Sequence, residues 1–345
     1  MPIAGYGPEN SKESFDLEKF EFRGLHPNIL IGTASDRYSG WIGQVYSEDR
    51  YRGKITRRTN QVGGKSFIEE VLPVESVEEY FEHFRVLEID FTFYRLLIDE
   101  DGQQTQNFQI LKSYRTHAKA RGCFVLKVPQ TIFAQKLRRK GGYVENEAYL
   151  NPGIFARQFY EPAVKLLGSN LSGFVFEQEY QRAKERRSPK EMASALDDFF
   201  SMIPKDKRYH VELRTESYLS NPVFEVLEKH GVGQVLSHWT WLPPLRKQFA
   251  KAGRKFFNSG GQGIIRLMTP RGTRYEDAYA MAHPFDKLVE GMLSPETIKD
   301  TVELMRAGIE RGISVNVIIN NRAGGNAPSI ARLVAEEFLS MGRAE

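Results

Sequence analysis

Short apolar runs alternate with longer amphipathic segments along most of this 345-residue chain. Each short run is rich in Val, Ile, Leu or Phe and is followed by residues typical of turns, which is the pattern of a buried β-strand. The expected strands are residues 29–32, 85–90, 123–128, 173–176, 209–213, 233–237, 263–268 and 313–319. The intervals between them leave room for a helix after each strand, as parallel strands require.

The intervening segments carry apolar residues at helical spacing. In the first of them, Val77, Tyr80 and Phe81 fall on one face of a helix. Several segments begin with proline directly after a capping residue, as at Ser188-Pro189, and this order favours a helix start. The expected helices are residues 73–84, 107–121, 152–167, 189–203, 222–230, 245–251, 295–311 and 328–341.

Eight strands alternating with eight helices predict an α/β protein built as a single (β/α)8 barrel, the TIM barrel, rather than an open sheet. No linker divides the chain, so we expect one barrel domain over residues 28–345. Residues 1–27 are mostly polar and lack a period, and we interpret them as an N-terminal tail or strap.

Alternation along the expected strands predicts charges inside the barrel. Successive residues of a barrel strand point into the barrel and toward the helices in turn. In residues 85–90, the apolar Leu87 and Ile89 suit the helix side, so Glu88 and Asp90 face inward. The same parity turns Lys127, His210, Glu212, Arg214, Arg266, Asn316 and Asn320 inward. Isolated buried charges cost several kcal/mol each, so the acidic and basic members must pair as an ion network.

Two interpretations of this network stay open: it fills the barrel, or it is a working site. Barrel sites are built at the C-terminal ends of the strands, where Asp90, Lys127 and Arg214 fall, so we favour a site. Carboxylates there suit general acid–base chemistry, and the basic side chains would stabilise negative charge in a transition state. The candidate catalytic residues are Glu88, Asp90, Lys127 and Glu212.

Segments that follow the strands are rich in basic residues, at 50–65, 136–140, 182–190 and 246–255, and at Arg271 and Arg274. All of them would lie on the C-terminal side of the barrel, which suggests an anionic ligand, either a phosphate ester or a nucleic acid backbone. The alternative is that they are solvated loops. Aromatic residues in the same segments, such as Trp41, Tyr94 and Trp239, could stack on a ring or base, or pack as a lid.

Composition narrows the class of protein. The net charge is a mild +4, no apolar stretch is long enough for a membrane helix, and Cys123 is the sole cysteine. We therefore expect a cytoplasmic protein without a disulfide or a membrane partner. The sequence holds no P-loop, no GxGxxG between a strand and a helix, and no HExxH or GxSxG. The cofactor stays open; magnesium or manganese on Glu88, Asp90, Glu177 or Glu212 is not favoured.

The motifs together resemble the DUF72 family, the YecE-like proteins of unassigned function. IGTASDRYSGWIGQVY (31–46) is similar to the family's opening segment, and EIDFTFYR (88–95) to its most recognisable motif. FVLKVP (124–129), VELR (211–214) and the NN…AP of 320–328 follow in the expected order. The resemblance covers nearly the whole chain and implies a TIM barrel. It departs at Asp90, where the family usually has asparagine, and at Thr215, where histidine is frequent.

The resemblance carries over no reaction, but the residues suggest an enzyme, of hydrolase or isomerase type, acting on an anionic small molecule that bears phosphate. The alternative is a nucleic-acid-binding protein without catalysis, whose basic loops contact phosphates while tryptophans stack on bases. The oligomeric state stays open. The candidate substrate-binding residues are Thr33, Trp41, Tyr94, Arg95, Arg214, His238, Trp239, Arg266, Arg274 and Asn320.

Overall fold

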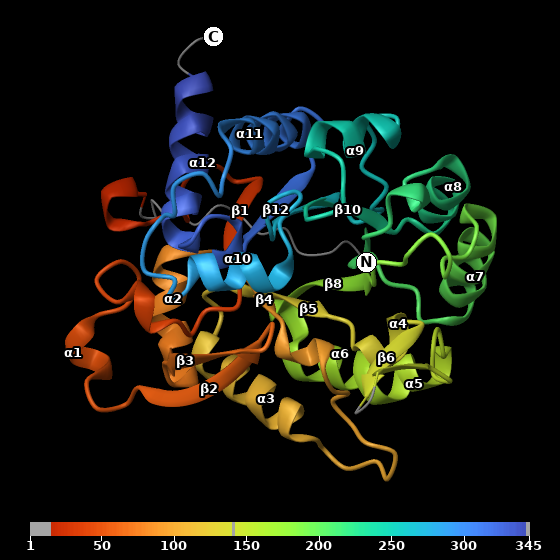
Figure 1. The fold of residues 1–345 in the computed structure, drawn as a ribbon, viewed down its shortest axis with the longest axis horizontal. Coiled ribbons are helices and arrows are strands. Elements are labelled where there is room, and N and C mark those ends of the chain that lie inside the picture. The colour runs from red at the N-terminus through yellow and green to blue at the C-terminus, as the bar shows by residue number, and fades with distance from the viewer. Residues whose placement is uncertain (1–14, 140–141, 343–345) are drawn as a thin grey trace, which may run out of the picture.

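Eight parallel strands close into a barrel in the computed structural model, which describes residues 15–139 and 142–342 (Figure 1). The strands are β1 (Ile29–Ala34), β4 (Val86–Ile89), β5 (Cys123–Lys127), β8 (Leu171–Gln178), β9 (Tyr209–Leu213), β10 (Gly233–His238), β11 (Gln262–Leu267) and β12 (Ser314–Ile319). Around the barrel their order is β1-β12-β11-β10-β9-β8-β5-β4. The predicted fold class is therefore confirmed, and each predicted strand overlaps one of these.

Helices encircle the barrel and cover its outer face (Figure 1). They are α2 (Val77–His83), α3 (Gln106–Ala118), α5 (Pro152–Phe155), α6 (Glu161–Leu167), α7 (Pro189–Met202), α8 (Asn221–His230), α9 (Leu245–Lys251), α11 (Pro295–Ile309) and α12 (Ala327–Gly342). Among the described residues, no helix is long and apolar enough to cross a membrane.

The predicted helix over residues 152–167 is interrupted by a π-helical turn at Ala156–Tyr160. Pro162 has no N–H to donate, so the carbonyl of Gln158 has no helical partner at that position. The backbone N–H groups of Leu97 and Ile98 donate to this carbonyl instead, at 3.1 and 3.0 Å. The helix thus ties the segment after β4 to the barrel wall.

The barrel interior has two layers, one apolar and one charged. The apolar layer consists of Val86, Val125, Val175, Val235, Ile264 and Ile318, all buried. Two residues further along, β4, β5, β8 and β11 carry Glu88, Lys127, Glu177 and Arg266, and β9 adds Glu212. This second set forms the charged layer. Because the strands are parallel, it lies toward their C-terminal ends.

Two β-hairpins and one helix stand on the C-terminal side of the barrel: β2 (Thr56–Val62) with β3 (Lys65–Val71), β6 (Lys136–Arg139) with β7 (Gly142–Glu145), and α10 (Tyr275–Ala282). The hairpins correct the interpretation of residues 50–65 and 136–140 as basic loops. Ion pairs across the first hairpin join Arg57 to Glu70 at 2.8 Å and Arg58 to Glu69 at 2.7 Å. Phe67 of this hairpin packs edge-on against Tyr279 of α10, which adds a small core above the barrel mouth.

Residues 15–27 pack against the opposite end of the barrel. Phe22 is buried, and its backbone N–H donates to the carbonyl of His83. The Arg23 guanidinium donates to the carbonyls of Phe81 and Phe84 at 2.9 and 3.0 Å, which satisfies free carbonyls at the end of α2. The first fourteen residues of the expected tail lie outside the described residues.

Candidate functional site

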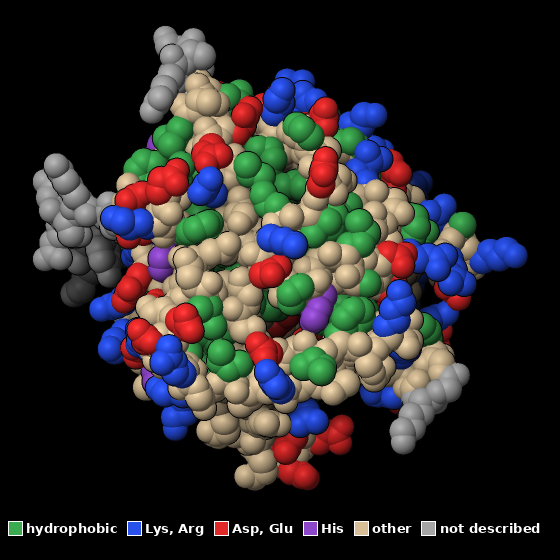
Figure 2. Space-filling view, turned by 60° about the vertical axis from the view of Figure 1, so that its left-hand side comes forward, with side chains coloured by type: hydrophobic (Ala, Val, Ile, Leu, Met, Phe, Trp, Pro, Cys, Tyr) green, Lys and Arg blue, Asp and Glu red, His purple; other side chains and the backbone are tan. Residues whose placement is uncertain are grey.

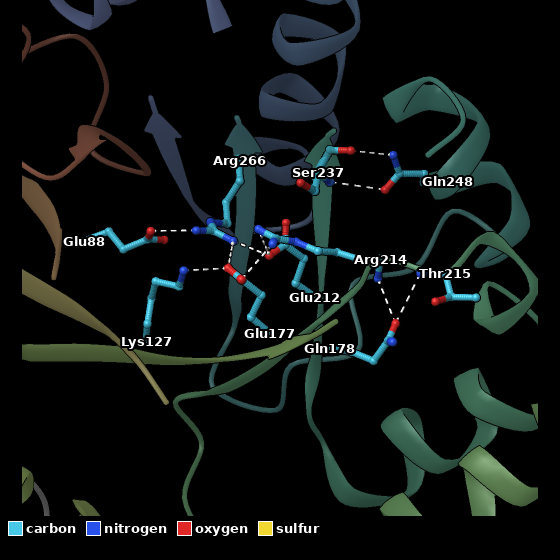
Figure 3. Close-up of polar contacts among 10 residues, drawn as sticks. All are labelled: Glu88, Lys127, Glu177, Gln178, Glu212, Arg214, Thr215, Ser237, Gln248 and Arg266. Atoms are coloured by element: carbon cyan, nitrogen blue, oxygen red, sulfur yellow. Dashed lines mark hydrogen bonds and ion pairs between the residues drawn. The ribbon is translucent and has the colours of Figure 1, made fainter. Parts of the chain in front are cut away.

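Arg266 lies inside the barrel with three carboxylates around its guanidinium (Figure 3). Nη2 is 2.7 Å from Glu88 Oε1, and Nη1 contacts Glu177 Oε2 at 3.2 Å and also Glu212 Oε2. Arg266 is 1% exposed, and the three carboxylates are also buried. The prediction from strand parity, that Glu88, Glu212 and Arg266 meet inside the barrel, is confirmed.

Glu177 connects this cluster to the barrel mouth (Figure 3). Besides Arg266, its carboxylate binds Lys127 Nζ at 2.7 Å and Arg214 Nη1 at 2.7 Å. The predicted strand ends at residue 176, so Glu177 is expected from the sequence only as an optional metal ligand. The strand β8 runs on to Gln178, and parity with Val175 would have turned Glu177 inward.

The two basic groups at the mouth are held between a carboxylate and an aromatic ring. Lys127 Nζ lies 4.2 Å from the centroid of Phe93, and the Arg214 guanidinium lies 4.9 Å from that of Trp239. Gln178 Oε1 accepts a hydrogen bond from the backbone N–H of Arg214 at 3.1 Å, which orients the chain there. Cation–π contact and ion pairing together fix both charges in place.

The environment divides the carboxyl groups into two kinds. Burial raises the pKa of Glu88, although Arg266 and Lys127 oppose the rise. Burial also raises the pKa of Asp90, against the charges of Lys127 and Arg322. Burial acts on Glu177 as well, but the charges of Arg214, Lys127 and Arg266 outweigh it and hold its pKa well below the usual range. Glu177 is therefore held ionised, whereas burial favours the protonated form of Glu88 and Asp90.

The larger of two cavities at the barrel mouth, cavity B, has a volume of about 1200 Å³. Its aromatic lining consists of Phe93, Tyr94, Tyr143, Tyr180, Trp239, Trp241 and Tyr275. Its basic lining consists of Lys136, Arg138, Arg182, Arg214 and Arg274, and its acidic lining consists of Glu177, Glu179, Glu185 and Glu276. Arg138, Arg182 and Arg274 are exposed and make no ion pair with any described residue. Cavity B therefore offers free positive charge beside aromatic faces.

The second cavity, cavity A, has a volume of about 680 Å³ and lies under the hairpin β2–β3 and α10. Its charged lining includes Asp36, Glu88, Asp90, Arg37, Arg58 and Arg322, and its aromatic lining includes Tyr38, Phe91, Tyr94, Tyr114, Tyr275, Tyr279 and Phe285. Burial raises the pKa of Asp36 to about 7, against a hydrogen bond from Tyr114. Tyr94 and Tyr275 line both cavities, so the two are neighbours.

Most basic residues of two predicted clusters are neutralised away from these cavities. In residues 50–65, Arg50 pairs with Glu78 at 2.8 Å and Lys54 with Glu75 at 2.8 Å. In residues 246–255, Lys255 pairs with Glu228 at 2.8 Å. Acidic and basic side chains are interspersed over the face shown in Figure 2. The three arginines of cavity B, Arg138, Arg182 and Arg274, are not neutralised in this way.

Two predicted binding residues are buried as structural groups. Thr33 is fully buried, and its backbone N–H and hydroxyl both hydrogen-bond to Tyr80 Oη at 2.9 Å. Trp41 is fully buried, and its Nε1–H donates to Asn321 Oδ1 at 3.2 Å. Neither side chain offers surface to a ligand, which corrects the expectation that they bind substrate.

Four further predicted binding residues line neither cavity, and one of them, Arg266, is 1% exposed among its three carboxylates. Arg95 is exposed on the segment after β4. His238 is 7% exposed, and burial lowers its pKa to about 4, so it is neutral. Asn320 accepts a hydrogen bond from the backbone N–H of Arg322 at 3.0 Å. The predicted residues that do line a cavity are Glu88, Asp90, Tyr94, Arg214, Trp239 and Arg274.

The carboxylates do not form a metal site in the part of the chain that the structure describes. No three Asp, Glu, His or Cys side chains among residues 15–139 and 142–342 are grouped as ligands. Glu88, Glu177 and Glu212 contact the guanidinium of Arg266 instead.

Comparisons with known proteins agree with the fold. The family described as "Protein of unknown function DUF72" matches residues 30–343. A solved structure of a DUF72 family protein from Thermotoga maritima MSB8 has a TM-score of 0.53 at 16% identity, covering 90% of this chain and 99% of that one. A DUF72 family protein from Enterococcus faecalis V583 has a TM-score of 0.52 at 14% identity, covering 92% of this chain and 99% of that one. No curated protein matches this chain. At such identities the likeness shows the fold alone.

Proposed function

This chain belongs to the DUF72 family of proteins of unknown function, and we propose that it is an enzyme that binds a phosphate-bearing ligand in cavity B. One observation carries the proposal: Arg138, Arg182 and Arg274 line cavity B without an acidic partner among the described residues. Arginine side chains suit bidentate recognition of phosphate. Arg214 lines cavity B, and Lys127 lies directly behind this lining, bound to Glu177 and over the ring of Phe93, so both stand beside the same ligand.

The charged layer supplies groups for a reaction of hydrolase or isomerase type. Lys127 and Arg214 would stabilise negative charge that develops on the ligand, because their positions are fixed before it arrives. Glu88 and Asp90 would transfer protons, since burial raises the pKa of both carboxyl groups toward the working range. Glu177 and Glu212 would stay in place as partners of the basic groups.

The test is thermal unfolding with increasing inorganic phosphate at constant ionic strength. A ligand that binds only the folded state stabilises it by about 2.7 kcal/mol at a hundredfold excess over Kd. We expect Arg138→Gln to weaken the affinity for phosphate about tenfold, so that about ten times more phosphate gives the same stabilisation. Arg139→Gln is the matched control, because Arg139 is also exposed on β6 but does not line cavity B. An absence of stabilisation by phosphate, or equal loss in both variants, would contradict the proposal.

A second candidate function, single-stranded nucleic acid binding without catalysis, is favoured by the exposure of aromatic rings around cavity B. Tyr143 is 71% exposed, Tyr94 is 68% exposed and Trp241 is 45% exposed. Stacking of a base on such a ring contributes about 1–3 kcal/mol, and phosphate contacts make the binding steeply salt-dependent. Strong salt-dependent binding of an oligonucleotide that survives Lys127→Met would favour this candidate over the enzyme.

A further inference from the structure

We propose that cavity A is the subsite for a hydroxyl-rich, sugar-like ring, with the Asp90 carboxylate as its main hydrogen-bond acceptor. The proposal rests on the proposed function, because it assigns to cavity A the uncharged part of the ligand whose phosphate lies in cavity B. The substrate class would then be a sugar phosphate. The evidence is the set of polar atoms that cavity A leaves without partners.

Carboxylate oxygens in cavity A lack hydrogen-bond donors. Asp90 makes no ion pair and no hydrogen bond to another side chain among the described residues, although it lines the cavity. Asp36 Oδ2 and Glu88 Oε2 are buried and also have no partner, while their other oxygens accept from Tyr114 and Arg266. Unpaired buried acceptors are costly, so the Asp36 and Glu88 oxygens, beside an Asp90 carboxylate that no described side chain binds, point to a ligand that donates hydrogen bonds.

Cavity A is also lined by arginines whose guanidinium groups bind no carboxylate among the described residues. Arg322 forms no ion pair with any described residue; its guanidinium lies 4.4 Å from the ring centroid of Tyr275. Arg37 donates to the carbonyl of Leu72 and not to a carboxylate. The ligand must therefore accept as well as donate hydrogen bonds. A hydroxyl group does both, and a ring of hydroxyls does so in several directions.

The charges lining cavity A favour an uncharged ligand part over an ion. Unpaired Asp90 is opposed by unpaired Arg322, and Arg58 is paired with Glu69 at 2.7 Å. A simple cation would be repelled by Arg37 and Arg322, and a simple anion would be repelled by the buried carboxylates. Aromatic faces from Tyr38, Phe91 and Tyr279 supply apolar surface for the C–H face of a ring.

The two cavities are close enough to serve one molecule. Tyr94 and Tyr275 line both, and Arg266 binds Glu88 of cavity A and Glu177 of cavity B through its two Nη atoms. A ring in cavity A would place its hydroxyls beside Asp90 and Glu88. These are the two carboxyl groups assigned to proton transfer in the proposed function.

The experiment measures binding of inorganic phosphate, free hexoses and pentoses, the monophosphates of both, and free amino acids by titration calorimetry. We expect at least one sugar monophosphate to bind tenfold or more tightly than inorganic phosphate. Asp90→Asn should remove most of that gain, because it replaces a charge-assisted acceptor by a neutral amide of the same shape. The affinity for inorganic phosphate should stay equal or rise. Asp49→Asn is the matched control, because Asp49 is 91% exposed and lies outside both cavities. It should change neither the affinity for the sugar monophosphate nor that for inorganic phosphate.

The outcomes separate the two proposals. Phosphate binding to which no sugar adds affinity, or a sugar gain that survives Asp90→Asn, would overturn the assignment of cavity A and leave the proposed function standing. Amino acids that bind more tightly than any sugar compound, with loss in Asp90→Asn, would overturn it in favour of a zwitterionic ligand. If only free sugars bind and Asp90→Asn abolishes their binding, the proposed phosphate binding in cavity B is wrong. The assignment of a sugar-like ring to cavity A then stands.

Discussion

The apolar and charged layers of the barrel are built from the same strands, two residues apart, yet they differ in what holds them together. Val86, Val125 and Val175 pack against one another and need no specific partner. Glu88, Lys127 and Glu177, two residues further on, are each bound by an opposite charge. An apolar interior is the less costly way to fill a barrel, because replacing buried ion networks with apolar groups is often neutral or stabilising. We therefore propose that the change to charge near the strand ends marks a site rather than a structural need.

The layers also differ in their exposure to the outside. The apolar layer is closed, whereas Lys127 and Arg214 keep 12% and 17% of their side chains exposed at the barrel mouth. Arg266 lies between these regions and is almost fully buried. We therefore expect substitutions at Arg266 to act on stability, and substitutions at the mouth to act mainly on ligands.

The largest effect should come from Arg266→Met. The change removes the ion-pair partner of the buried Glu88, leaves Glu212 with Arg214 at 3.3 Å, and leaves Glu177 with its two outer partners. Breaking a buried network in this way costs about 3–5 kcal/mol, measured by denaturant unfolding at neutral pH. The loss should shrink at acid pH, where the carboxylates become protonated. A loss below about 1 kcal/mol at neutral pH would mean that the charged layer is open to water throughout.

A pH effect should come from Asp36, which burial holds at a pKa of about 7 instead of 3.8. A raised pKa in the folded state means that its stabilising contribution is complete below pH 4 and is lost as the pH rises to about 7. The difference in unfolding free energy between the wild type and Asp36→Asn should fall across this window, by up to roughly 4 kcal/mol. Unfolding curves of both proteins at several pH values measure it. A flat difference would show that Asp36 titrates normally.

In the apolar layer, Val175→Ala should cost about 2 kcal/mol, because it removes two buried methyl groups and leaves a small void. Val175 lies two residues before Glu177 on β8, so the pair compares the layers on one strand. Ligand affinity should not change in Val175→Ala, and calorimetric titration with phosphate checks this. A change in affinity greater than threefold would show that the two layers are coupled.

The smallest effect should be a gain. Asp90 is a partly buried carboxylate without a side-chain partner, and burial raises its pKa. Asp90→Asn should therefore stabilise the protein at neutral pH by about 1 kcal/mol, as is common when a strained functional group is removed. Thermal unfolding detects the gain as a rise in Tm. Equal Tm values for the two proteins would indicate that water already satisfies this carboxylate.

Much of the fold could be predicted because its signals are local. Strand parity alone brought Glu88, Glu212 and Arg266 together, although they are far apart in the sequence. The prediction stopped short at Glu177, since a polar residue at the end of an apolar run looks like the start of a loop. The sequence shows no strand signal there; only the neighbouring strands extend β8.

The two hairpins could not be predicted from the apolar pattern. Both faces of β2 and β3 carry charged or polar residues, so their alternation has no hydrophobic period to detect. What pairs them is the match of Arg57 with Glu70 and of Arg58 with Glu69, and this match depends on a register that the turn sets. Thr33 and Trp41 failed as binding candidates because their polar groups hydrogen-bond within the fold, to Tyr80 and Asn321.

Lys127→Met tests whether the charged layer serves a ligand or only holds the barrel together. Glu177 keeps Arg214 and Arg266 as partners when Lys127 is removed, so the unfolding free energy should change by less than about 1 kcal/mol. The affinity for phosphate should fall by tenfold or more, measured by calorimetric titration on the same preparation. A large drop in Tm with phosphate affinity intact would show that the ion network stabilises the barrel and serves no ligand.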